Sequence, residues 1–174
     1  LRSRGLGDVY KRQAKYVNEE VASVEEALQG ARDIIAEMIA DNADYRKWIR
    51  EYTTKNGEIQ SKVRDKSLDE RHVYEQYYEY SEPISRIVPH RVLAMNRGES
   101  EKILRISITE NAEGVYTYLS KQFIKDASGE AANQVMMAIE DAYKRLIKPS
   151  IEREIRASLK EVAENQAIHI FSEN

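Results

Sequence analysis

Apolar residues recur at intervals of three and four positions through most of this 174-residue chain. That spacing places them on one face of an α-helix, so it predicts amphipathic helices rather than strands. The pattern is clearest in residues 24–39, 115–123, 135–147 and 151–170. We therefore expect a mainly α, multi-helical protein, a helix-turn-helix-like bundle with at most one small β element.

Two helices are predicted near the N-terminal end of this pattern. Ser23, followed three residues later by Glu26, forms a capping box and predicts the start of the first helix. Asp41-Asn42 should end that helix, and a second helix should run from there to Gly57, where glycine adopts the left-handed turn without steric strain. Two antiparallel helices joined by a short turn are the expected product.

A single convincing strand is predicted at residues 102–109, where apolar side chains occupy alternate positions. A lone strand needs a partner. The partner is either the extended segment at residues 57–63 or sequence outside this chain.

A run of tyrosines from Tyr74 to Tyr80 has the spacing of one helix face. Base stacking on single-stranded nucleic acid is one interpretation of such a run. Packing of the rings with their hydroxyl groups at the rim is the other. We favour packing, because Glu75, Glu79 and Glu82 make the segment acidic.

Prolines organise the remaining helices. Pro89 suits the first turn of a helix that should end at Gly98. Pro149 should interrupt the later apolar stripe, with Ser150 capping the helix that follows. That last helix still carries apolar residues at Phe171 and shows no stop signal, which predicts a truncated chain.

Residues 1–13 differ in character from the rest. They contain four basic residues and one acidic residue, and Asp8 to Gln13 read as a translated transposase end from sequencing-library preparation. We predict a non-native leader; a disordered native N-terminus is the alternative. The whole chain carries a net charge of −3, and residues 14–174, with 23 basic and 29 acidic residues, carry −6. Strong overall attraction to nucleic acid is therefore not expected.

The composition argues against most enzyme classes. The chain has no cysteine, so it has neither disulfides nor thiolate metal sites, and its histidines at positions 72, 90 and 169 are too far apart for a metal motif. It has no apolar stretch of about 18 residues that could span a membrane. No Ser–His pair lies in a nucleophile-bearing turn. We expect a non-enzymatic, cofactor-free, cytoplasmic protein.

The densest basic cluster lies around Pro89 and in the residues that follow it. It comprises Arg86, His90, Arg91, Arg97, Lys102 and Arg105. Phosphate contact is one interpretation, since backbone N–H groups point outward at the helix start near Pro89. Salt bridges to nearby acids, with His90 in a polar pocket, are the other. We expect Arg91 to pair internally and Arg97 to lie free at an exposed turn.

A second basic group surrounds Pro149. It comprises Lys144, Arg145, Lys148, Arg153 and Arg156. Glu152 and Glu154 interleave with these residues at ion-pair spacing, so we expect intramolecular ion pairs here rather than a binding surface.

Three segments together resemble the Tex family of bacterial transcription accessory proteins: GARDIIAEMIAD at 30–41, EPISRIVPHRVLAMNRGE at 82–99, and the stretch from Asp141 to Asn174. The resemblance implies a large multi-domain parent with a helical N-terminal region and an RNase-H-like domain that usually lacks nuclease activity. Helix-hairpin-helix motifs and an RNA-binding OB-fold domain would follow. This chain resembles the helical central part alone, with the RNase-H-like and OB-fold domains absent.

The sequence thus predicts a fragment of a Tex-like protein that acts as a non-catalytic helical scaffold and positions RNA- or DNA-binding domains. The alternative is a helical protein–protein interaction module with no nucleic-acid contact of its own. RNA polymerase or the ribosome are further expected partners of the parent. The expected divisions are a leader (1–13), an N-terminal helical part (14–82), a linker helix with a strand (83–112) and a C-terminal helical part (113–174).

Overall fold

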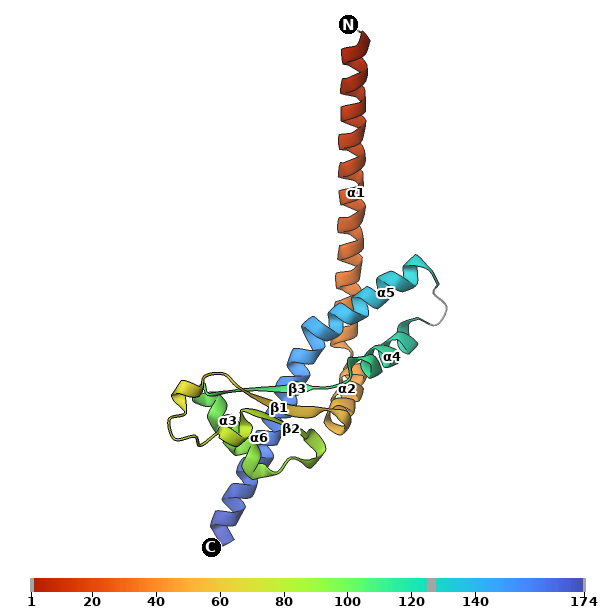
Figure 1. The fold of residues 1–174 in the computed structure, drawn as a ribbon. Coiled ribbons are helices and arrows are strands. Elements are labelled where there is room, and N and C mark those ends of the chain that lie inside the picture. The colour runs from red at the N-terminus through yellow and green to blue at the C-terminus, as the bar shows by residue number, and fades with distance from the viewer. Residues whose placement is uncertain (1, 125–127, 174) are drawn as a thin grey trace.

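The computed structural model describes residues 2–124 and 128–173. Six α-helices and a small sheet make up these residues, so the mainly α fold with a small β element is confirmed. The elements are α1 (Arg2–Asp41), α2 (Ala43–Asn56), β1 (Glu58–Val63), β2 (Glu79–Pro83), α3 (Pro89–Ser100), β3 (Leu104–Thr109), α4 (Ala112–Phe123), α5 (Glu130–Asp141) and α6 (Lys148–Glu173). Figure 1 shows α1 and α6 projecting from opposite ends of the body that the other elements form.

The first helix is longer than its capping box predicted. α1 runs unbroken from Arg2 to Asp41, so the predicted start at Ser23 is wrong. Apolar residues continue at helical spacing before Ser23, and one capping side chain contributes only about 1 kcal/mol, too little to end a propagating helix. Residues 2–13 of the predicted leader are part of this helix, and residues 7–13 are exposed. Its non-native origin stays a prediction.

The break between the first two helices lies where it was predicted. Asn42 separates α1 from α2, and its side-chain oxygen accepts a hydrogen bond from the Tyr45 N–H at 3.0 Å. The predicted antiparallel pairing is wrong, because α2 continues beyond the end of α1 instead of folding back along it (Figure 1). A single linking residue is too short for an αα-hairpin, which needs a loop of about two to five residues.

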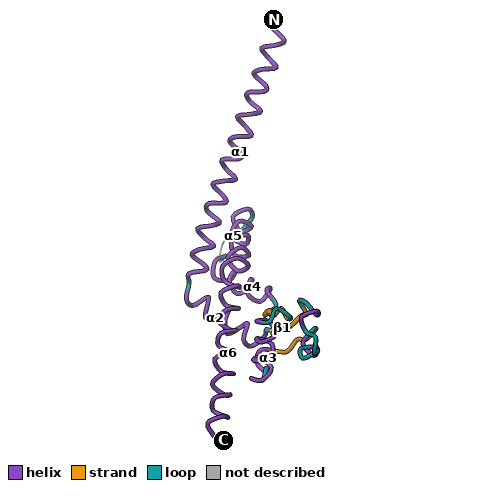
Figure 2. The backbone as a smooth tube through the Cα atoms, turned by 90° about the vertical axis from the view of Figure 1, so that its left-hand side faces the viewer, coloured by secondary structure: helices purple, strands orange, loops and turns teal. Residues whose placement is uncertain are grey.

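The sheet is antiparallel, with strand order β2-β1-β3. The predicted strand pairs with the segment at 57–63, which settles the choice of partner in favour of this chain: Ile59 faces Ile108 and Ser61 faces Ile106. Figure 2 shows the sheet and its loops to one side of α5 and α6.

The tyrosine run does not form the predicted helix. Its residues form a short 3₁₀ turn (Glu75–Tyr77) and then β2. The rings of Tyr74 and Tyr77 are buried in the core, so the packing interpretation is confirmed. Strand pairing prevails because Pro83 disfavours helix at the preceding residue and a free-standing helix of this length is unstable in water.

Gly57 ends α2 as predicted, but for a different reason. Its φ is −84°, so it does not adopt the left-handed turn. A Cβ at this position would lie 2.5 Å from the Thr53 carbonyl oxygen and 3.1 Å from that of Thr109. Glycine is required here because two backbone segments approach each other closely.

The predicted break at Pro149 is also wrong. The helical path continues from α5 through a π-helical segment, Ala142–Ile147, directly into α6. The wider π turn precedes the proline and accommodates its missing N–H. Ser150 therefore does not cap a new helix; its hydroxyl donates to the Ile147 carbonyl oxygen at 3.0 Å.

Aromatic rings join α2 to α4. The Trp48 ring stacks on Tyr118 at a centroid distance of 3.9 Å and on Tyr52 at 5.1 Å. Tyr45 meets Phe123 edge to face at 5.6 Å. Such contacts contribute beyond their burial and fix the position of α4 against α2.

Candidate functional site

The chain reverses between α3 and β3 through a strained lysine. The Lys102 N–H donates to the Glu99 carbonyl oxygen at 3.0 Å, and the Ile103 N–H donates to that of Gly98 at 3.0 Å. This is the Schellman arrangement, whose left-handed position usually carries glycine. Lys102 occupies that position with φ of 63°, and its side chain is exposed.

Gly98 lies inside α3, so its predicted role as the stop of this helix is wrong. The helix continues to Ser100. A Cβ on Gly98 would lie 2.5 Å from Leu104 Cδ1 and 3.1 Å from Tyr74 Cδ1. Glycine here lets β3 and the loop that carries Tyr74 pack directly against the helix.

The sheet brings more cations to the end at which β3 begins, beside the turn that carries Lys102. The register of β1 and β3 places Lys62 opposite Arg105, and both side chains are exposed. One step further, the Arg64 N–H donates to the Ile103 carbonyl oxygen at 2.7 Å. Arg64 therefore lies beside the turn that carries Lys102. Like charges directly opposite each other in a sheet are destabilising.

The loop between β1 and β2 is organised around a buried carboxylate. Asp69, 3% exposed, accepts hydrogen bonds from the N–H groups of Val73 and Tyr74, both at 2.9 Å, and from the Tyr78 hydroxyl at 2.7 Å. Burial acts to raise the pKa of Asp69, but these three hydrogen bonds together lower it. The hydrogen bond to Asp69, together with burial, raises the pKa of Tyr78 to about 12.

This ordered loop adds two more cations to the same end of the sheet. The Lys66 ammonium lies 5.6 Å from the centre of the Tyr78 ring, and Arg71 is exposed. Arg71 and Arg97 line a shared hollow of about 380 Å³ between the loop and the end of α3.

We call this group of exposed cations the basic corner. It comprises Lys62, Arg64, Lys66, Arg71, Arg97, Lys102 and Arg105. None of the seven forms an ion pair with another residue in the described ranges. The exposed carboxylates within residues 62–80 and 97–105, the two stretches that carry these cations, are Asp65, Glu70, Glu75, Glu79 and Glu101.

The structure separates the six cations predicted from the sequence. Arg97, Lys102 and Arg105 belong to the basic corner. His90 lies at the opposite end of α3, about 10 Å from Arg97 along the helix axis at 1.5 Å per residue. Arg86 precedes that end, and both Arg86 and His90 are exposed. His90 instead lines an apolar hollow of about 200 Å³ between α3 and α6.

Arg91 forms an internal ion pair, as expected. Its Nη1 lies 2.8 Å from Glu82 Oε1, and the Glu82 side chain is 14% exposed. The Tyr80 hydroxyl donates to the other oxygen of Glu82 at 2.7 Å. The carboxylate of Glu82 therefore anchors the start of α3 to β2.

The second predicted basic group is largely paired, although not with the acids expected. Arg145 pairs with Asp141, Lys148 with Glu110, and Arg156 with Glu99. The expected acids have other partners. Glu154 pairs with Arg50 of α2 at 2.7 Å, and Glu152 accepts a hydrogen bond from the Ile108 N–H on the outer edge of β3 at 3.0 Å.

Sequence reasoning missed four members of the basic corner: Lys62, Arg64, Lys66 and Arg71. A usable signal existed for two of them. Ile59, Ser61 and Val63 alternate with Lys62 and Arg64, so the strand pattern itself assigns both cations to the outer face. The two loop cations carry no such periodicity.

Among the described residues, no cluster of three or more His, Cys, Asp or Glu side chains could hold a metal ion. No helix in the same ranges is both long and apolar enough to cross a bilayer.

These features define a mainly α protein with a small antiparallel sheet and an unpaired basic surface. The chain belongs to the Tex central region-like family, whose family model matches residues 8–171, so the resemblance found in the sequence is confirmed. It is 54% identical over 163 residues to YdcI of Bacillus subtilis (strain 168), covering 92% of this chain and 23% of YdcI.

Two further relatives carry descriptive names. The transcriptional accessory protein Tex of Neisseria gonorrhoeae is 28% identical over 168 residues, which is 91% of this chain and 22% of that protein. The human S1 RNA-binding domain-containing protein 1 is 32% identical over 158 residues, 83% of this chain and 16% of that protein. The chain thus spans less than a quarter of the length of these relatives.

Proposed function

We propose that this chain is the rigid helical scaffold of a longer Tex-like transcription accessory protein and that it takes no part in catalysis. The observation that carries the proposal is the placement of α1 and α6, which leave the body at opposite ends (Figure 1). Domains joined to these two helices would be held apart at a fixed spacing. We propose RNA- or DNA-binding domains as the ones positioned; the name of the human relative supports RNA binding, and that of the Neisseria relative supports a role in transcription.

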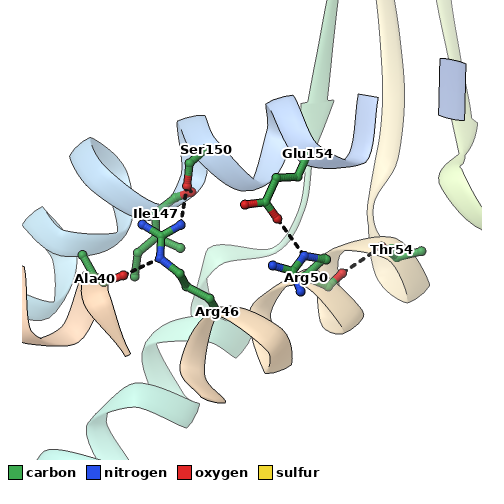
Figure 3. A network of polar contacts seen from close by, with 7 residues as sticks. All are labelled: Ala40, Arg46, Arg50, Thr54, Ile147, Ser150 and Glu154. Carbon is green, nitrogen blue, oxygen red and sulfur yellow. Dashed lines mark hydrogen bonds and ion pairs between the residues drawn. The ribbon is translucent and has the colours of Figure 1, made fainter. Parts of the chain in front are cut away.

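A polar junction supports rigidity where the long helices meet (Figure 3). The Arg46 guanidinium on α2 donates to the Ala40 carbonyl oxygen at the end of α1 and to the Ser150 hydroxyl on α6, the latter at 2.6 Å. Arg50, one turn later, pairs with Glu154 of α6. One arginine thus connects three helices, and forked guanidinium contacts of this kind fix orientation as well as distance.

A distance measurement between spin labels tests the scaffold. The chain contains no cysteine, so Glu19→Cys on α1 and Ser158→Cys on α6 give specific labelling sites, both exposed. We expect one narrow distance distribution. Arg46→Ala should broaden it, whereas Arg86→Ala, which removes an exposed arginine outside the junction, should not. A broad distribution in the parent chain would refute the scaffold proposal.

A second candidate function is protein docking through α1, the alternative predicted from the sequence. Val17, Val21 and Val24 are 54%, 57% and 54% exposed, and with Ala14 and Leu28 they continue an apolar stripe spaced alternately by three and four residues. This spacing is typical of a coiled-coil seam.

Sedimentation at increasing protein concentration tests the docking function. An exposed seam predicts self-association that a Val17→Ser/Val21→Ser/Val24→Ser variant abolishes, because serine removes apolar surface without adding charge. A parent chain that stays monomeric at high concentration would count against docking through this face. RNA polymerase and the ribosome remain predicted partners of the parent protein.

A further inference from the structure

We propose that the basic corner binds the sugar–phosphate backbone of nucleic acid directly, without reading the bases. This step goes beyond the scaffold role, which requires no nucleic-acid contact from this chain.

These cations have no internal ion-pair partners within the described ranges. The basic corner holds seven cations, and residues 62–80 and 97–105 add five exposed carboxylates and the buried carboxylate of Asp69. Glu99 in the same stretch is neutralised by its ion pair with Arg156, so the corner carries +1 while the whole chain carries −3. Lys62 lies next to Glu79 in the sheet register, yet no ion pair joins them. By contrast, Arg91, Arg145 and Arg156 elsewhere are paired. Four of the seven cations are arginines, whose forked guanidinium groups suit phosphate oxygens.

The fold keeps cations at positions where other residues would be more stable. Lys102 adopts the left-handed conformation with φ of 63°, at the position of a Schellman turn where glycine would be unstrained. Lys62 and Arg105 are cross-strand neighbours of like charge. Unfavourable local choices of this kind concentrate at functional sites.

The burial of the nearby aromatic rings indicates which part of a nucleic acid the basic corner recognises. Binding of single strands combines basic grooves with exposed aromatic rings on which bases stack. Near the basic corner, Tyr74 and Tyr77 are buried, and the Tyr78 hydroxyl is bound to Asp69. The stacked Trp48 and Tyr52 belong to α2, which leads into the other end of β1. Among the described residues of the corner, no Tyr, Phe or Trp ring is fully exposed, so the corner offers charge rather than a platform of aromatic rings, which suits the backbone.

Fluorescence anisotropy with the 174-residue chain tests the proposal. The probes are a labelled 20-base-pair DNA duplex and a single-stranded RNA of 20 nucleotides, titrated from 50 to 200 mM salt. We expect the duplex to bind at least as tightly as the single strand. The logarithm of the affinity should fall linearly with the logarithm of the salt concentration, by about 0.9 per phosphate contact.

Two variants assign the contacts. Arg64→Ala/Arg105→Ala should reduce the salt slope by about two. Lys102→Gly should reduce it by about one while relieving the strained turn, so the protein stays folded and its melting temperature does not fall. The matched control is Lys47→Ala/Lys55→Ala, which removes two exposed lysines of α2 outside the corner and should leave the slope unchanged.

Three results would overturn the proposal. The first is an equal loss in the α2 control, because binding would then follow net charge rather than the basic corner. The second is single-strand affinity more than about tenfold above duplex affinity, which would require base stacking. The third is competition by poly-L-glutamate that exceeds competition by unlabelled duplex at equal charge, which would assign the surface to an acidic protein. None of these results bears on the label distances that test the scaffold.

Discussion

Tyr143 and Tyr116 are neighbouring buried tyrosines, and only the hydroxyl group of Tyr143 has a hydrogen-bond partner among the described residues. Their rings meet edge to face, with centroids 5.6 Å apart. Tyr143 donates its hydroxyl to Glu110, a carboxylate that is 2% exposed and lies 3.3 Å from the Lys148 ammonium. The Tyr116 hydroxyl is buried and has no hydrogen-bond partner in the part of the chain that the structure describes.

Removing the two hydroxyl groups should therefore have opposite effects on stability. Tyr143→Phe should lower the free energy of unfolding by about 1.5–3 kcal/mol, because it removes a hydrogen bond to a buried charged group. Tyr116→Phe should leave it unchanged or raise it by up to about 1 kcal/mol, because an unsatisfied buried hydroxyl disappears. Urea unfolding followed by circular dichroism gives both values, with an unchanged denaturant slope as the check on two-state behaviour.

The pH dependence supplies an independent check. Burial, and then the hydrogen bond to Glu110, raise the pKa of Tyr143 above its ordinary value of 10.0. The stabilisation from this group is therefore complete below pH 10 and is lost as the pH rises above that value. Tyr143→Phe should remove this alkaline loss. Equal effects of the two substitutions, or an unaltered alkaline profile in Tyr143→Phe, would refute the reasoning.

Three other perturbations test the fold. Gly98→Ala should lower the free energy of unfolding by about 1–2 kcal/mol in a urea titration, because overpacking against Leu104 exceeds the helix preference of alanine; a stabilised variant would contradict the close packing. Asp69 has a lowered pKa, so its stabilisation is present above pH 3.8 and is lost as the pH falls through the lower folded value; Asp69→Asn should flatten the acid limb of melting temperature against pH, and an unchanged limb would count against it. Deleting residues 1–13 should change stability by no more than about 0.5 kcal/mol, since residues 7–13 are exposed; a clear drop in melting temperature would show that the leader packs.

The sequence predicted helix boundaries and strands correctly where neighbouring residues alone determine the backbone conformation. Asn42 interrupts the helix because its side chain caps the next one, and Pro89 opens α3 because a first helical turn does not need its missing N–H. Alternating residues predicted β3 and the extended segment that became β1. The pairing of Arg91 was also anticipated, from its position near the core face.

Longer-range contacts decided the rest, because they depend on residues far apart in the chain. The tyrosines before Pro83 have helical spacing, yet Tyr77 ends a 3₁₀ turn and Tyr80 pairs with Ser61 of β1 as part of a strand. The sequence predicts both Gly57 and Gly98 as helix stops, and only Gly57 ends a helix. Both positions need glycine because a Cβ would meet Thr109 at Gly57 and Leu104 at Gly98. Pro149 has the sequence signature of a helix break, but the helix continues through it because the preceding π-helical segment accommodates its missing N–H.

The candidate site shows the same division. The sequence alone identified Arg97, Lys102 and Arg105 as a dense group of cations, because they lie within nine residues of one another. Alternation puts Lys62 and Arg64 on the outer face of a strand, but only the β1–β3 register brings them to the group, and only the loop around Asp69 brings Lys66 and Arg71. The sequence alone also could not remove His90, which a rigid helix holds at its far end. Composition and periodicity fix what each segment prefers, whereas strand register and packing decide which charges become neighbours.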